Sequence, residues 1–130
     1  KTLMTVMLDS ILNNAARHGF GKRKGDNHQV EISISNVSYK EQPYVLLSVA
    51  NNGSSFADGF TVEDYISKGR FVSSTGRSGL GGYHVHQITK GHNGFLCLDS
   101  NKIWSVIVDV LIPLSITEEN SYPAYEKECV

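Results

Sequence analysis

The sequence is poor in cysteine and has no excess of charge of either sign. Its two cysteines, Cys97 and Cys129, stand in unrelated contexts, one inside an apolar run and one near the C-terminal end. This arrangement matches neither a disulfide framework nor a zinc motif, so we expect a reducing, cytoplasmic environment. The 12 Lys and Arg residues nearly balance the 13 Asp and Glu residues. We therefore expect neither nucleic acid nor an anionic membrane as the main partner.

Long apolar runs are also absent. No run approaches the roughly 20 residues that a membrane-spanning helix needs. The chain starts inside a helical pattern, with no signal peptide and no initiator Met, so we expect a fragment of a longer protein. The part outside this sequence leaves open whether the full-length protein is attached to a membrane. With 130 residues, the chain fits one domain with a sizeable core.

The spacing of apolar residues predicts two main helices and four strands. A helical stripe runs between residues 2 and 18, and a second helix follows the glycine-rich stretch 76–82 and ends at a Gly/Asn stop. Thr61, with Asp64 three residues later, is typical of the start of a short helix reaching residue 68. The predicted strands are 30–35, which we expect to be half-buried, and 44–50, 94–98 and 104–112. This order is typical of an α/β (α+β) two-layer sandwich, a mainly antiparallel sheet with helices packed on one face.

Within this layout we expect a domain at 1–113 and a poorly ordered polar tail or linker at 114–130. Residues 57–78 show little regular pattern, which is typical of a lid over a functional site. Lys68, Arg70 and Arg77 are either solvated surface charges or groups that reach a phosphate when the lid closes.

Three polar stretches carry the candidate chemistry. Asn14 lies inside the first predicted helix and shares one edge of it with Ser10 and Arg17. It is either an amide that caps the helix or satisfies polar groups in the core, or an oxygen ligand for Mg²⁺. The second stretch, Asn51 to Phe56, follows a predicted strand. It is either a simple turn or a loop that carries binding groups. The glycine-rich entrance to the later helix is an ordinary turn, or it exposes backbone N–H groups that bind phosphate.

These three stretches, in this order, resemble the nucleotide-binding boxes of the Bergerat-fold ATPases (GHKL), and most of all the ATP-binding catalytic domain (HATPase_c) of sensor histidine kinases. Ile11 to Gly19 resembles the N box, Asn51 to Phe56 resembles the box that holds adenine, and Gly79 to Gly94 resembles the second glycine box and its helix. The resemblance covers roughly residues 1–113.

The resemblance implies a set of site residues for Mg-ATP. Asn14 falls on the Mg²⁺-binding asparagine, and with Arg17 it would be catalytic; Asn51 would contact adenine, and Gly53 would let the base approach. The remaining nucleotide-binding positions implied are His18, Phe56, Arg77, Gly79, Leu80 and Gly81.

Four positions depart from the family pattern. Asn51 replaces an aspartate, so its amide oxygen accepts without charge assistance, and we expect weaker or less selective adenine binding. Ser55 and Arg77 replace glycines, which could narrow the site. Ser10 stands where hydrolysing members carry a glutamate, and a serine is no general base near neutral pH, so hydrolysis of the gyrase or mismatch-repair type is disfavoured.

The resemblance therefore implies the catalytic domain of a two-component histidine kinase, with its phosphoacceptor and dimerisation domain outside this fragment and a response regulator as a further partner. The alternative is a degenerate module of the same fold, without catalysis, that senses nucleotide or binds another protein; a gyrase- or mismatch-repair-type ATPase is less favoured.

Overall fold

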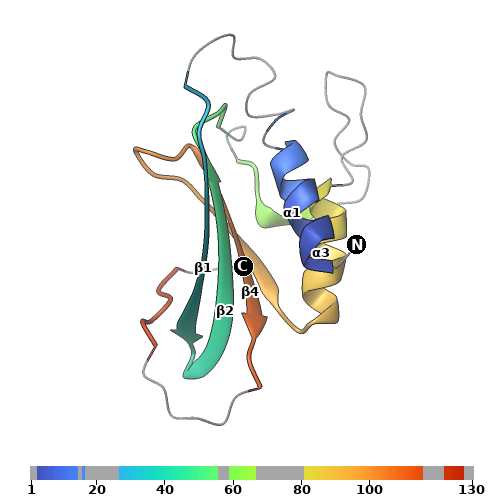
Figure 1. The fold of residues 1–130 in the computed structure, drawn as a ribbon, viewed down its shortest axis with the longest axis vertical. Coiled ribbons are helices and arrows are strands. Elements are labelled where there is room, and N and C mark those ends of the chain that lie inside the picture. The colour runs from blue at the N-terminus through green and yellow to red at the C-terminus, as the bar shows by residue number, and fades with distance from the viewer. Residues whose placement is uncertain are drawn as a thin grey trace.

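The computed structural model describes residues 3–14, 16, 27–55, 59–66, 81–115 and 122–127 of the chain, leaving aside the side chains of residues 3, 4 and 14. Figure 1 shows the arrangement of its helices and strands. In chain order they are α1 (Leu3–Asn14), β1 (Val30–Tyr39), β2 (Gln42–Asn51), α2 (Val62–Ile66), α3 (Gly81–Gly91), β3 (Phe95–Asp99) and β4 (Val106–Pro113).

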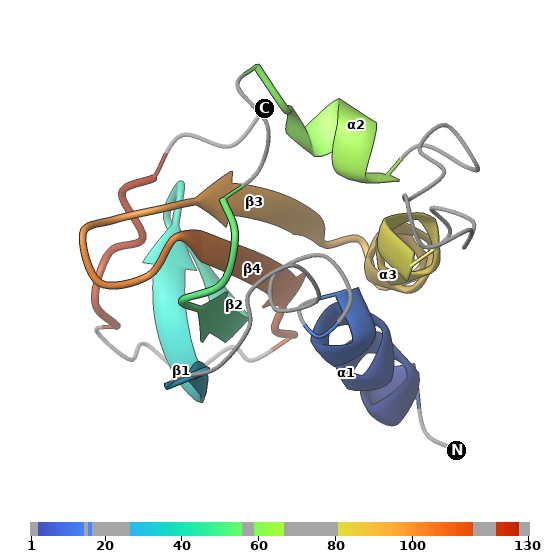
Figure 2. The same ribbon diagram turned by 90° about the horizontal axis from the view of Figure 1, so that it is seen from above.

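The four strands form one antiparallel sheet with the order β1-β2-β4-β3. Helices α1 and α3 pack against each other on one side of this sheet (Figure 2). The prediction of a two-layer α+β sandwich with a mainly antiparallel sheet is therefore confirmed. No helix in the described part of the chain is both long enough and apolar enough to span a lipid bilayer.

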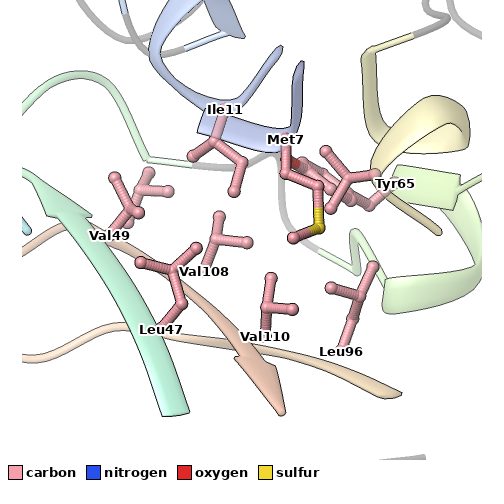
Figure 3. Packing of buried hydrophobic residues seen from close by; sticks show 10 residues of the cluster. Met7, Ile11, Leu47, Val49, Tyr65, Leu96, Val108 and Val110 are labelled. Carbon is pink, nitrogen blue, oxygen red and sulfur yellow. The ribbon is translucent and has the colours of Figure 1, made fainter. Parts of the chain in front are cut away.

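The core lies between the helices and the sheet. Met7 and Ile11 project from α1 onto alternate residues of two central strands, including Val49 of β2 and Val108 of β4 (Figure 3). The register pairs Val49 with Val108, so their side chains lie on the same face of the sheet. The other buried members of this cluster are Leu47, Tyr65, Val85, Leu96, Val106 and Val110.

Two small residues of α3 fix its position. The hydroxyl of Thr89, fully buried, donates to the carbonyl oxygen of Val85 at 2.7 Å and lies 3.7 Å from the sulfur of Met7 in α1. Gly82 lies so close to α2 that a Cβ atom there would clash with the backbone carbonyl of Tyr65. The first turn of α3 therefore packs directly on α2 at a position where only glycine fits.

Helix α2 begins as predicted. The N–H of Asp64 donates to the hydroxyl of Thr61 at 3.2 Å, and the N–H of Thr61 donates to the carboxylate of Asp64 at 3.0 Å. These reciprocal bonds satisfy backbone donors that the first turn of a helix leaves without partners. The predicted cap at Thr61 is confirmed.

The hairpin of β1 and β2 is longer than predicted, and one face of β1 is more exposed. Lys40 and Glu41 both have positive φ, 49° and 65°, as a two-residue turn of type I′ requires. The expectation of a half-buried β1 is wrong for its first part, since Val30, Ile32 and Ile34 are 40%, 46% and 62% exposed. The reason is position: β1 is an edge strand, and the helix-side core draws on β2, β3 and β4.

Part of the expected tail packs on the domain. Residues 122–127, here called the C-terminal strap, run parallel to the end of β1 (Figure 1). The N–H of Ser38 donates to the carbonyl of Pro123 at 2.9 Å, and the N–H of Tyr125 donates to the carbonyl of Ser38 at 2.8 Å. The expectation of a poorly ordered tail does not hold for these residues, because Tyr125 buries its ring on the back face of the sheet, the face away from the helices. The division of the chain at residue 113 stays a prediction.

The expectation for the cysteines is also corrected. Cys97 is disulfide-bonded in the structure, and its side chain lies in the same back-face cluster as Tyr125. Cys129, the other cysteine of the sequence, lies outside the described residues. The spacing of the two cysteines gave no sign of this bond because it depends on which segments meet on the back face of the sheet.

Candidate functional site

The ends of several elements meet at one end of the molecule. The C-terminal end of α1, the end of β2, the turn between β3 and β4, and the first turn of α3 all lie toward the upper end of Figure 1. The predicted adenine box begins at Asn51, the last residue of β2, and the predicted second glycine box contains Gly81, the first residue of α3. The fold therefore brings elements that are far apart in the sequence to one end of the sheet.

Asn51 is the last residue of β2 and is 5% exposed. Its cross-strand partner in β4 is Val106, a member of the helix-side core, so its side chain also lies on the helix side of the sheet. The Oδ1 atom of Asn51 accepts the N–H of Gly53 at 2.9 Å. A backbone N–H can only donate, so this bond identifies which end of the amide is oxygen.

Asn52 has different hydrogen-bond partners from those of Asn51. Its Oδ1 accepts the N–H of Gln29 at 2.8 Å, and its Nδ2 donates to the carbonyl of Asn27 at 2.8 Å. Its own N–H donates to the carbonyl of Gln29 at 3.3 Å. Asn52 therefore ties the loop after β2 to the segment that leads into β1.

Ser105, just before β4, supports the same loop from the other side. Its hydroxyl donates to the carbonyl of Gly53 at 2.5 Å, and the carbonyl of Asn51 lies 3.3 Å away. The turn that carries Ser105 is itself held by Asn101, whose Oδ1 accepts the N–H groups of Ile103 and Trp104 at 2.9 and 2.7 Å. Sequence reasoning missed Ser105; a lone polar residue before an apolar strand was the one signal available.

A polar cleft of about 600 Å³ opens between these two loops. Its lining residues are Asn52, Gly53, Ser54, Ser55, Asn101, Lys102, Ile103 and Ser105. Ser55, one of the departures from the family pattern, therefore lies on the wall of this cleft.

Helix α3 has its predicted start and stop. It begins at Gly81, and after Gly91 its last carbonyls are capped: the N–H of Asn93, at φ 60°, donates to Lys90, and the N–H of Gly94 donates to Thr89, both at 2.9 Å. The Nδ1 atom of His92 lies 2.8 Å from the carbonyl of Ile88. His92 therefore caps the far end of α3, about 16 Å from Gly81 at 1.5 Å per residue.

The remaining predicted site residues are placed only in part. Asn14 is the last residue of α1, and its side chain lies outside the described part of the structure. Of the predicted site, Asn51 and Gly53 are brought together by a hydrogen bond, and Gly81 starts α3. Arg17, His18, Phe56, Lys68, Arg70, Arg77, Gly79 and Leu80 lie outside the described residues, as does most of the predicted lid.

The described residues contain no cluster of His, Cys, Asp or Glu that could by itself hold a metal ion. A Mg²⁺ bound with ATP does not need such a cluster, because it keeps waters and takes most of its other ligands from phosphates. An amide oxygen at the end of α1 fits that donor set, and Asn14 stays a predicted ligand.

No family model and no curated protein sequence matches this chain. Solved structures do match. The histidine kinase domain of the blue-light activated histidine kinase EL346 from Erythrobacter litoralis is 20% identical with a TM-score of 0.59, over 87% of this chain and 44% of that chain. A second structure of that kinase gives 20% identity and a TM-score of 0.61, over 87% of this chain and 30% of that one. The mycobacterial sensor histidine kinase MprB is 18% identical with a TM-score of 0.64, over 83% of this chain and 70% of that chain.

The chain thus spans less than half the length of the first two kinase structures that it matches. At 18–20% identity the likeness concerns the fold alone. The chain has the fold of the catalytic domain of histidine kinases.

Proposed function

We propose that this domain binds Mg-ATP and donates the γ-phosphate to a histidine on a separate domain of the same protein, as the catalytic domain of a two-component sensor histidine kinase. The observation that supports this most is the loop after β2, where Asn51, Asn52 and Ser105 together fix a bend at the end of the sheet. In a histidine-kinase fold that bend corresponds to the predicted adenine-binding box.

Each predicted residue then has a chemical role. Asn14 would give an amide oxygen to Mg²⁺, and Arg17 would neutralise charge on the transferred phosphate. Asn51 would contact the base, and Gly53 would leave room for it. Gly79 and Gly81 would offer backbone N–H groups to the phosphates, with His18, Phe56, Leu80 and Arg77 around the nucleotide. Bound Mg²⁺ would supply charge neutralisation between the phosphates.

The reaction needs little more than positioning from this domain. Phosphoryl transfer depends on alignment and electrostatic stabilisation more than on covalent chemistry by the protein. Ser10 on α1 precedes Asn14 by about one turn, and its hydroxyl cannot activate water as a carboxylate would. We therefore propose transfer to a phosphoacceptor domain, with a response regulator as the later recipient.

Calorimetric titration with ATP tests the proposal, with and without Mg²⁺. Asn14→Ala should lose the Mg²⁺-dependent part of binding, at least about tenfold in Kd, which corresponds to about 1.4 kcal/mol. Asn13→Ala is the matched control, since Asn13 is the same residue type, one position earlier on α1 and exposed. Equal Mg²⁺-dependent affinities of both variants would remove Asn14 from the site.

The second candidate is a degenerate module of this fold that binds a partner without catalysis. Asn51 in place of an acidic residue and Ser55 on the wall of the cleft favour it. It predicts no heat from any nucleotide with protein that circular dichroism shows to be folded. Steady release of phosphate by the isolated domain would instead favour an ATP hydrolase.

A further inference from the structure

We infer that the base site accepts 6-oxopurines, guanine or hypoxanthine, as well as adenine, because Asn51 is held with its amide nitrogen free to meet the base. This inference rests on the proposed function, since it concerns the base of the same nucleotide. It makes Asn51 the residue that determines base specificity.

The first step is the orientation of the amide. Asn51 and Gly53 are both buried, and the 2.9 Å bond from the Gly53 N–H requires an acceptor, so Oδ1 must face Gly53. Turning the amide over would set its NH₂ group against that N–H and leave a buried donor unpaired, which is unfavourable. The Nδ2 atom therefore points away from the backbone of the loop.

The second step is that the loop cannot easily release this orientation. The carbonyl of Gly53 accepts the hydroxyl of Ser105, and the next residue, Asn52, is bonded on both ends of its amide. Gly53 is thus held through its N–H by Asn51 and through its carbonyl by Ser105. Within the described part of the chain, Asn51 Nδ2 has no hydrogen-bond acceptor, so its two N–H groups are available to a ligand.

The third step compares the bases. Adenine presents an amine at its 6-position, which donates; guanine and hypoxanthine present a carbonyl oxygen there, which accepts. A carboxylate only accepts, so it favours adenine and repels the 6-oxo group. The amide of Asn51 offers both kinds of group: Nδ2 donates to a 6-oxo oxygen, and the second lone pair of Oδ1 accepts from the adenine amine. Neither base leaves Asn51 with a repulsive contact.

The expected difference in affinity between ATP and the 6-oxopurine nucleotides depends on whether residue 51 is charged. Hydrogen bonds to an ionised acceptor are roughly twice as strong as bonds between neutral groups. An aspartate would gain this strength with adenine and lose it with guanine, whereas an amide gives bonds of similar strength with both. We expect the Kd values for ATP, GTP and ITP to lie within about tenfold of one another, or 1.4 kcal/mol.

Asn51→Asp is the decisive variant. The aspartate has nearly the same shape and can still accept the N–H of Gly53, so the loop should keep its fold. It should raise the preference for ATP over GTP and ITP by at least about tenfold. Asn36→Asp is the control: Asn36 is exposed on β1, six residues from Val30, the cross-strand partner of Asn51, and the variant makes the same change from amide to carboxylate away from the loop. It should leave the ratio of the Kd values unchanged.

The measurement is calorimetric titration of the domain and both variants with the Mg²⁺ complexes of ATP, GTP and ITP. If the unmodified domain binds ATP but binds GTP and ITP more than about tenfold more weakly, this inference is overturned and the proposed function stands. The inference is also overturned if the Asn51→Asp variant, shown by circular dichroism to be folded, has the same ratio of Kd values for ATP and for GTP or ITP as the unmodified domain. No binding of any nucleotide by folded protein would overturn the proposed function itself.

Discussion

Gly82 shows how a single residue controls the contact between two helices. A Cβ atom there would clash with the backbone carbonyl of Tyr65 in α2, whereas nothing lies within 4 Å of a Cβ atom at Gly91, in the same helix. We expect Gly82→Ala to destabilise the domain by about 1–3 kcal/mol, because backbone must move to make room. Gly91→Ala should be neutral or stabilise by up to about 1 kcal/mol. Urea denaturation of both variants measures this; equal midpoints would contradict the clash.

The same glycine marks a limit of sequence reading at this scale. The stretch 76–82 contains four glycines, and the pattern alone treats them all as room for phosphate. In the structure Gly82 instead makes room for a carbonyl of the protein itself. Whether a glycine leaves room for a ligand or for packing depends on where α2 lies, and the residues around Gly82 do not show that α2 packs there. Asn51 was found from sequence, but the direction of its amide was not, because Gly53 and Ser105 set it.

Helix α2 illustrates what local sequence does determine. Thr61 and Asp64 form reciprocal bonds that need only neighbouring residues, and the spacing predicted them. Thr61→Ala should destabilise the domain by about 1 kcal/mol, since it leaves an N-terminal donor of the helix without its partner. Thr61→Ser should retain most of the stability. Amide exchange within α2, compared between the two variants, checks this; equal protection would show that the cap contributes nothing.

The C-terminal strap is the element that local sequence could not predict. The hydroxyl of Tyr125 donates to the Oδ2 atom of Asp109 at 2.7 Å, and Nζ of Lys127 lies 2.8 Å from the same atom and 3.1 Å from Asp99. Asp109 is 1% exposed, in the middle of an apolar strand. A carboxylate there is tolerable only with partners, and those partners lie 16 and 18 residues further along the chain, outside the strand that carries Asp109.

Removing one of these partners should loosen the strap. Tyr125→Phe keeps the ring and deletes one hydrogen bond to Asp109, at a cost of about 1–2 kcal/mol. Lys127→Met removes the ion pairs with both Asp109 and Asp99. Because the Lys127 side chain is 38% exposed, we expect a similar cost rather than that of a fully buried pair. Lys102→Met, at an exposed lysine of the turn before β4, is the control. Faster amide exchange at Tyr125 in both variants but not in the control is the expected result; unchanged exchange would show that the strap docks without Asp109.

At the scale of the whole molecule, both high and low pH should weaken the docking of the strap. Burial, the bond to Asp109 and nearby negative charges raise the pKa of Tyr125. Burial lowers the pKa of Lys127, but the bonds and charges of Asp109 and Asp99 outweigh it, so the net shift is upward. Both contributions to stability are present below the unfolded pKa values of about 10, and they are lost as pH rises through the folded values.

At low pH, stability changes with pH in the opposite direction, because the pKa of Asp99 is lowered in the folded state. Burial raises the pKa of Asp99, but the N–H of Ser100 and the bond and charge of Lys127 together lower it. This contribution is present above the unfolded pKa of about 4 and is lost as pH falls through the folded value. We expect the strap to detach at both extremes of pH. A tyrosinate absorbance titration should show one tyrosine that ionises late, and Tyr125→Phe should remove it; an unchanged profile in that variant would contradict the assignment.

The fold as a whole was predictable because its helices, its hairpins and their order follow from local periodicity. At this scale, the features that the sequence did not reveal involve the two faces of the sheet and its edge. Cys97 and Tyr125 meet on its back face, and the first part of β1 lies beyond the helices. Which strand is at the edge depends on pairing between distant segments, so alternation along 30–35 predicted a strand correctly and its burial wrongly.

The uncovered row on β1 has a consequence for handling the isolated domain. Val30, Ile32 and Ile34 are β-branched residues on the first strand of the sheet order, and such an edge can recruit further strands from solution. Concentrated samples should therefore aggregate, with light scattering that increases with protein concentration and storage time. Ile34→Lys, at the most exposed of the three, should suppress it without loss of thermal stability. A crystallographer working with this domain would begin with that variant.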